Sequence, residues 1–224
     1  MKRFILFVFA ALALCSCKNS DNDVYSETQQ TSYLISTYAF INAMSVRQVE
    51  ALDGNNTDII EFVESFINAS QNAEKERHSY FSNLYGDTSY TGYTFKINSP
   101  ALAYPFDKIT MSCHSDFDDE HLAGEPLDDI VKLKFGSFWE FIQNGYEYPE
   151  SCEKPEIVDS ASTGEILHTY LLSEIGRENS KLISLRKPII HFTSSPATPG
   201  KYTFTLELTT NGETFITTFT QTFE

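Results

Sequence analysis

The chain has 224 residues and a formal net charge of −15 at pH 7, from 31 acidic and 16 basic side chains. This acidic excess argues against a nucleic-acid partner, because phosphate binding depends on clusters of Lys and Arg. Its content of 41% hydrophobic and 14% aromatic residues is enough to build a folded core, and the 18 Phe and 12 Tyr favour strands.

The N-terminal segment reads as an export signal. Lys2 and Arg3 precede an apolar run over residues 4–14. This run is shorter than the roughly 20 residues that a transmembrane helix needs. A basic start, a short apolar block and a small residue before a cysteine are typical of a secretory signal peptide. The sequence therefore predicts a signal peptide at residues 1–16.

The end of this signal resembles the lipobox of bacterial lipoproteins, in Leu14-Cys15-Ser16-Cys17. In that family the cysteine becomes the first residue of the mature chain and carries the lipid. Cys17 fits better than Cys15, because the small Ser16 precedes it whereas the bulky Leu14 precedes Cys15. The resemblance implies that Cys17 is the lipid attachment site and that the protein is held at a membrane, with cleavage without lipidation as the alternative.

Residues 17–31 are polar and predict a flexible tether. Asp21 and Asp23 resemble the acidic surface-export signal of Bacteroidetes lipoproteins, although Asn19 and Asn22 dilute the acidic run. The resemblance implies a lipid-anchored protein of the outer membrane, exposed at the cell surface. The inner leaflet of the outer membrane and a tether without a signal are the two alternatives.

The first part of the folded domain mixes strand and helix signals. Residues 32–40 are β-branched and aromatic and predict a strand, whereas residues 44–52 fit either a strand or a helix. Residues 58–69 predict a helix because their apolar side chains recur at helical spacing. Residues 71–77 are polar and predict a helix end or a loop. The apolar residues at helical spacing are Ile59, Phe62, Val63, Phe66 and Ile67.

Further along, alternating patterns predict strands near residues 90–97, 106–113, 131–135 and 187–192. The second of these places Cys113 on its apolar face. Residues 138–142 are expected to be a core patch, residues 148–163 a surface loop, and residues 166–175 a short helix.

The clearest unit closes the chain. Residues 201–208 and 215–223 alternate between apolar and polar side chains on either side of Asn211-Gly212. Asn-Gly between alternating strands predicts a β-hairpin with a type I′ turn. With no βαβ rhythm, the pattern indicates a mainly β fold. We expect a single antiparallel β-sandwich of immunoglobulin-like type over residues 32–224, with one or two short helices.

Two stretches together resemble a group of Bacteroidetes lipoproteins with a β-rich domain of unknown function. One is residues 106–111 followed by 116–124, and the other runs from Pro188 to Phe219 and contains the Asn211-Gly212 turn. This resemblance implies a surface-anchored β domain. It supplies no catalytic residue.

The acidic segment 116–129 is a candidate calcium site, because alternate carboxylates can gather oxygen ligands. The EF-hand pattern fails, since His121 occupies the glycine position and Leu127 the position of the bidentate acid. His114 and His121 flank the same segment and are a candidate metal pair. A solvated loop explains the segment more simply, so we assign no metal site and no cofactor.

Covalent features are expected at two other places. After processing, Cys113 and Cys152 are the remaining cysteines, and an even pair outside the cytoplasm suggests a disulfide. A buried free Cys113 is the alternative. Asp159-Ser160-Ala161 matches a short Bacteroidetes O-glycosylation pattern, which makes Ser160 a candidate glycosylation site.

No hydrolase, metalloprotease or phosphate-loop motif occurs in the sequence, so we expect a protein that is not an enzyme. The favoured function is a binding module for a glycan or a protein partner. A structural subunit of an uptake or fimbrial assembly and a hydrolase with an unrecognised site are the alternatives. Tyrosines expected in or near loops are candidate ligand contacts: Tyr85, Tyr90, Tyr93, Tyr104, Tyr146 and Tyr148.

Overall fold

The computed structural model describes residues 29–30, 32–50, 56–91, 93–94, 100–150 and 164–224. Within them the chain is mainly β, with 47% strand and 12% helix. The predicted signal peptide, Cys17, Cys152 and Ser160 lie outside these residues. Among the helices of the described part, none has the length and apolar character to span a membrane.

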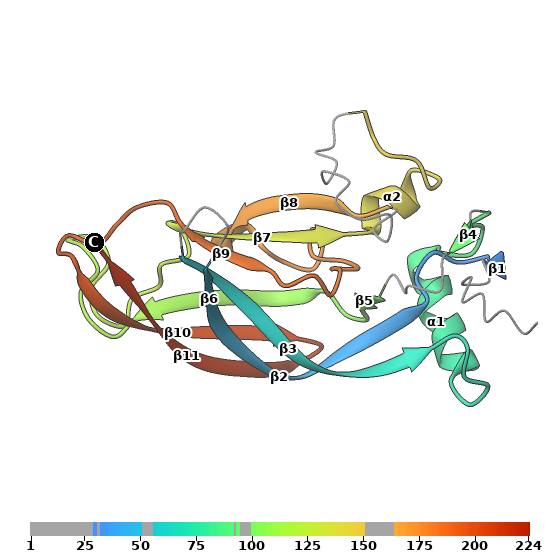
Figure 1. The fold of residues 1–224 in the computed structure, drawn as a ribbon, viewed down its shortest axis with the longest axis horizontal. Helices are drawn as coiled ribbons and strands as arrows, with labels where there is room; N and C mark the ends of the chain where they lie inside the picture. The colour runs from blue at the N-terminus through green and yellow to red at the C-terminus, as the bar shows by residue number, and fades with distance from the viewer. Residues whose placement is uncertain (1–28, 31, 51–55, 92, 95–99, 151–163) are drawn as a thin grey trace, which may run out of the picture.

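A three-stranded antiparallel sheet contains the predicted hairpin (Figure 1). Its strand order is β11-β10-β6, with β6 at Phe106–Cys113, β10 at Gly200–Thr210 and β11 at Glu213–Phe223. Thr210 pairs with Glu213 across the turn, and both turn residues have the positive φ that a type I′ turn requires, 50° at Asn211 and 78° at Gly212. The hairpin prediction is confirmed.

A six-stranded sheet has the order β5-β2-β3-β9-β7-β8. Its pairings are antiparallel except that of β2 with β5, which is parallel. The expectation of a purely antiparallel fold is therefore wrong at this edge. The strands are β2 at Thr37–Glu50, β3 at Asn56–Asn68, β5 at Pro100–Leu102, β7 at Val131–Ser137, β8 at Ile166–Leu171 and β9 at Ile189–Phe192. A small separate pair joins β1 (Gln29–Gln30) to β4 (Tyr93–Thr94).

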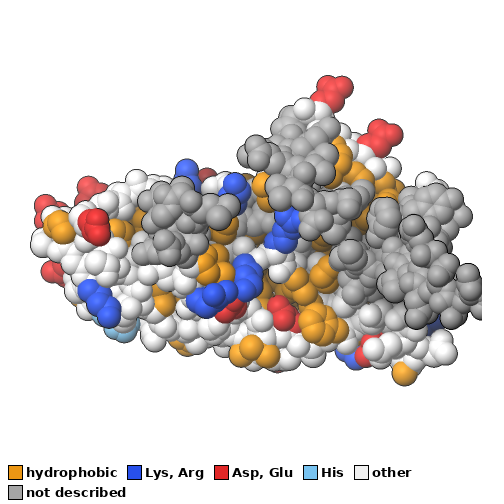
Figure 2. Space-filling view, in the orientation of Figure 1, with side chains coloured by type: hydrophobic (Ala, Val, Ile, Leu, Met, Phe, Trp, Pro, Cys, Tyr) orange, Lys and Arg blue, Asp and Glu red, His pale blue; other side chains and the backbone are white. Residues whose placement is uncertain are grey.

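The helix predicted over residues 58–69 is wrong, because this segment is strand β3 and pairs with β2 along its length. Its apolar residues lie in different surroundings. Ile60 is in one hydrophobic cluster, Ile67 is in another, and Val63 and Phe66 are 62% and 49% exposed. Figure 2 shows apolar side chains reaching the surface over the β2–β3 region. A strand with changing surroundings loses strict alternation, and here its apolar residues fall at helical spacing.

Helix α1 spans Lys75–Tyr85, whereas the sequence predicted a helix end or loop over residues 71–77 and no element over residues 78–85. It ends at Gly86, whose φ of 71° gives the left-handed cap that glycine favours. The helix predicted at residues 166–175 is instead β8 followed by a short 3-10 turn, η1, at Leu172–Glu174. Helix α2, at Trp139–Gln143, buries Phe141 and Ile142, which confirms the predicted core patch.

Two hydrophobic clusters hold these elements together. The first includes Phe204 and Leu206 from the three-stranded sheet and Ile60 and Leu133 from the six-stranded sheet. The second joins the start of β2 to α1, α2 and the segment after β5. Figure 1 shows α1 and α2 toward the same end of the molecule, away from the C-terminus.

Polar contacts fix α1 to the chain that leads into β2. The Asp87 carboxylate, just after the helix, accepts the N–H groups of Leu34 and Ile35 at 2.8 Å each. His78 Nε2 donates to the Ile35 carbonyl at 2.9 Å, and its Nδ1 lies 3.4 Å from the Ser82 hydroxyl. These buried groups therefore satisfy backbone polar atoms at the helix–strand junction.

Candidate functional site: a groove at the turn of the terminal hairpin

A groove of about 280 Å³ lies where the β10–β11 turn approaches β2. We call it the hairpin groove. Its walls come from β2, from the segment after β5 and from the start of β11. These strands are far apart in the sequence but adjacent in space, because β5 pairs with β2 and β11 packs beside β2.

The apolar part of the hairpin groove has three half-buried aromatic rings, from Phe40, Tyr104 and Phe215. The rings of Phe40 and Tyr104 meet edge to face, with centroids 5.7 Å apart. Phe81 of α1 supports both, at 5.6 Å from Phe40 and 5.5 Å from Tyr104. This packing fixes the orientation of Phe40 and Tyr104 without a ligand.

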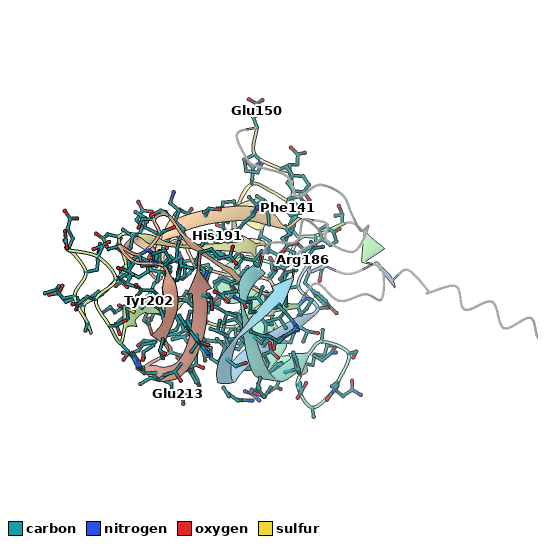
Figure 3. All side chains as sticks on the ribbon, turned by 60° about the vertical axis from the view of Figure 1, so that its left-hand side comes forward. Phe141, Glu150, Arg186, His191, Tyr202 and Glu213 are labelled. Carbon is teal, nitrogen blue, oxygen red and sulfur yellow. The ribbon has the colours of Figure 1, made fainter. Side chains whose placement is uncertain are left out.

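The polar part of the groove has exposed side chains on both sides. Asn42 and Ser65 come from β2 and β3, and the Ser65 hydroxyl lies 3.5 Å from Asn42 Oδ1. Asn211 and Glu213 come from the hairpin turn, and Figure 3 shows Glu213 at the lower edge of the molecule. Amide, hydroxyl and carboxylate groups together supply hydrogen-bond donors and acceptors. The groove thus combines fixed rings with polar groups along its rim, as small-molecule sites do.

The tyrosines proposed as ligand contacts mostly serve the second hydrophobic cluster. Tyr85 donates to the Ala103 carbonyl at 2.6 Å, and Tyr146 donates to Asp87 at 3.1 Å. Tyr148 accepts the N–H of Gly164 at 2.9 Å. Tyr90 packs on Tyr146 with ring centroids 5.2 Å apart, and the side chain of Tyr93 lies outside the described part. Tyr104 is the member of this set that lines the hairpin groove.

The acidic segment 116–129 is a loop whose carboxylates bind protein groups. Asp128 accepts the Thr110 hydroxyl and the Met111 N–H, and Asp118 accepts the backbone N–H of His121 at 2.8 Å. The described residues contain no group of three or more His, Cys, Asp or Glu side chains placed to hold a metal ion. The hydrogen bonds of these carboxylates therefore order the loop itself.

The two histidines of this loop have separate partners. His121 is buried between Asp118 and Asp129, at 2.7 and 3.1 Å from the two ring nitrogens. Burial alone would lower the pKa of His121, but the hydrogen bonds with the two carboxylates outweigh it and raise the pKa. His114 is exposed and its Nε2 lies 2.8 Å from the Thr205 hydroxyl.

Cys113 is 1% exposed at the end of β6, as its place on the apolar face predicted. Among the described residues it has no disulfide partner, and its Sγ lies 3.7 Å from the Ser115 hydroxyl. Because Cys152 lies outside the described residues, the disulfide between them stays a prediction.

Sequence reasoning did not single out Phe40, Asn42 or Glu213 as ligand contacts. Asn211 and Phe215 entered the argument only as turn and strand residues. The Asn211-Gly212 turn could be recognised from the sequence, but no local pattern in the sequence indicates that Tyr104 lies beside it.

Comparison with protein-family models, with curated proteins and with solved structures finds no match for this chain.

Proposed function

We propose that this chain is a non-catalytic binding module that takes up a glycan in the hairpin groove. The observation that carries the proposal is the pairing of fixed aromatic rings, Phe40 and Tyr104, with exposed polar groups, Asn42 and Glu213. Sugar rings present apolar C–H faces and peripheral hydroxyl groups, so they need an aromatic surface and hydrogen-bonding side chains at once.

The test is glycan binding by the mature chain, first on an array of polysaccharides and then by calorimetry with the best ligand. Asn42→Ala and Glu213→Gln should each weaken binding about tenfold, as the loss of one or two useful hydrogen bonds predicts. Glu207→Gln is the matched control, because Glu207 is an exposed residue of the same hairpin outside the groove. Equal affinity of the groove variants and the control would refute the proposed site, and failure of every glycan to bind would refute the proposed ligand class.

We also propose that residues 1–16 are a signal peptide and that Cys17 carries a lipid that anchors the protein to the outer membrane. The apolar run before Cys17 and the small Ser16 support this location. Cys17→Ala should release the protein into the soluble fraction or leave an unprocessed precursor. A variant that is still acylated and membrane-bound would assign the lipid to another residue, with Cys15 as the next candidate.

Exposure at the cell surface is a further part of the proposal. Replacement of Asp21 and Asp23 by alanine should reduce cleavage by protease added to intact cells, at unchanged total abundance. Unchanged cleavage would mean that these acids do not direct export.

We infer that the domain is an immunoglobulin-like sandwich of the two larger sheets. The support for this inference is that side chains from both sheets share the first hydrophobic cluster.

A second candidate function is a structural subunit of an outer-membrane assembly. It is favoured by β11, which is eleven residues long and forms one edge of its sheet. Long edge strands can pair with a strand of another chain. Cross-linking in native membranes should then join a partner to a cysteine placed at Thr220, and recovery of the uncross-linked chain alone would exclude this function.

A further inference from the structure

A second cavity, of about 320 Å³, lies near the C-terminal end of β11. We call it the polar cavity. Its lining includes Asp58 from β3, His191 from β9 and Gln221 from β11. Glu213 and Gln221 are eight residues apart on one strand, which corresponds to roughly 27 Å. The polar cavity is therefore separate from the hairpin groove, and Figure 3 shows His191 well away from Glu213.

Within the described part of the chain, the buried carboxylate of Asp58 has one weak hydrogen bond. It is 3% exposed, and its hydrogen-bond partner is the amide of Gln48, with Nε2 3.5 Å from Oδ1. That distance is at the outer limit for a hydrogen bond. Buried carboxylates in proteins are ordinarily paired with a cation or bound by several donors. A carboxylate has two acceptor oxygens, so beyond this hydrogen bond with a described residue Asp58 can accept others from a group in the cavity.

Gln221 adds a second acceptor to the same cavity. Its Oε1 atom is buried and has no hydrogen-bond partner within the described part of the chain. The residue alternates with Phe219 and Phe223 on β11, so it occupies a position of the strand where apolar side chains are otherwise found. Ser194 and Ser195, whose side chains have hydroxyl groups, also line the cavity.

We propose that the polar cavity binds a primary ammonium group carried by a small organic ligand, with Asp58 as its counter-ion. An ammonium group has three N–H donors, and the oxygens of Asp58, Gln221 and the two serines are acceptors for them. A calcium ion requires six to eight oxygen ligands, usually with several carboxylates. The cavity has one buried carboxylate and no cluster of three ligating side chains among the described residues, so an organic cation fits it better.

The protonation states of the lining residues are compatible with a cationic ligand. Burial raises the pKa of Asp58 to about 6, against a smaller lowering by Gln48, so the carboxylate is mostly ionised at pH 7.5. Burial lowers the pKa of His191, and Lys134 on the neighbouring strand lowers it further, so the imidazole is neutral at that pH. Among the described lining residues, the Asp58 carboxylate is then the ionised side chain of the cavity, and Lys134 lies nearby on the adjacent strand.

The experiment uses the mature chain at pH 7.5 and two amine probes, glucosamine and 1,5-diaminopentane. Their neutral counterparts, glucose and 1,5-pentanediol, keep the carbon skeleton but lack the ammonium group. Binding is followed by NMR through the side-chain amide signal of Gln221 and by titration calorimetry. At least one amine should shift the Gln221 signal, and neither neutral compound should do so.

Variants of the lining residues test whether the amines bind in the polar cavity. Asp58→Asn should weaken amine binding at least tenfold, and Gln221→Leu should weaken it several-fold. The matched control Glu64→Gln removes a carboxylate of the same strand outside the cavity and should leave affinity unchanged. Failure of both amines to bind, or equal binding by Asp58→Asn and the parent chain, would overturn the proposal. Calcium binding that requires Asp58 and excludes the amines would also overturn it and would assign the cavity to a metal ion.

Discussion

The molecule contains two long antiparallel strand pairs that the sequence describes very differently. The β10–β11 hairpin has strands of eleven residues each and alternates visibly along its length. The β2–β3 pair has strands of 14 and 13 residues, yet the apolar residues of β3 fall at helical spacing and part of β2 fits either a strand or a helix. Length and pairing are similar, so the difference lies in what each pair packs against.

The inward face of β10 meets one continuous core, in which Phe204, Leu206 and Leu208 are all fully buried. The β2–β3 pair passes from the first hydrophobic cluster to the second, and a register shift between Ile41 and Ala43 interrupts its alternation. A one-residue shift exchanges the two faces of a strand. Alternation in a sequence thus reports a single, unchanging buried face, and a long strand without one is easily mistaken for a helix.

The largest expected effect is a difference in stability between Phe-to-Ala variants of the two strand pairs, because their phenylalanines differ in burial. Phe204→Ala in β10 should lower the free energy of unfolding by about 3–5 kcal/mol, since it removes a fully buried ring. The matched change Phe66→Ala in β3 should cost no more than about 0.5 kcal/mol, because Phe66 is 49% exposed. Urea denaturation of both variants measures the difference. Similar losses would show that the exposed face of β3 is covered in solution.

The next effect addresses how the start of β2 is held. Asp87→Ala should destabilise the protein by about 2–3 kcal/mol, because it leaves the buried N–H groups of Leu34 and Ile35 without acceptors. Hydrogen exchange should accelerate most at residues 34–40 and least in β10 and β11. The exposed Asp119→Ala is the control and should change neither quantity. Uniform acceleration over both strand pairs would mean that α1 and the hairpin unfold as one unit.

The hairpin has its own weak point at the turn. Gly212→Ala should cost about 1 kcal/mol, because alanine tolerates a positive φ poorly. Gly200→Ala lies on the same strand pair and is the control, since its added Cβ would meet only an ordinary contact, 3.8 Å from the Tyr202 ring. Thermal unfolding should show a lower Tm for the first variant than for the second. Equal Tm values would indicate that core packing alone selects this turn.

The smallest expected effect depends on pH and on the acid within β3. The pKa of Asp58 is raised from 3.8 to about 6 in the folded state, so folding favours the protonated carboxyl. Stability should therefore fall as pH rises from about 4 to above 6, where the unfolded chain is ionised and the folded chain pays the cost of burying the charge. Asp58→Asn should be more stable than the parent by about 1 kcal/mol at pH 7.5, after allowance for solvent screening at the cavity, and equal to it at pH 4. A constant difference at both pH values would show that the carboxyl does not titrate in this range.

Local patterns in the sequence were sufficient for the elements with one buried face. Strands β6, β7, β9, β10 and β11 and the Asn211-Gly212 turn follow from alternation and turn chemistry, which depend on neighbouring residues. The mainly β class follows from the same signals. For the acidic segment 116–129 the sequence offered a calcium site or a solvated loop. In the structure Asp128 and Asp118 accept hydrogen bonds from protein groups.

Tertiary structure decided the features that depend on distant partners. It made β3 a strand, placed β5 parallel to β2, and used Tyr85 and Tyr146 as internal hydrogen-bond donors. It also assembled the hairpin groove, where Tyr104 meets a turn that lies more than a hundred residues further along the chain. The physical reason is the same in each case: alternation and turn chemistry act between neighbours in sequence, whereas burial and pairing depend on which distant segments meet.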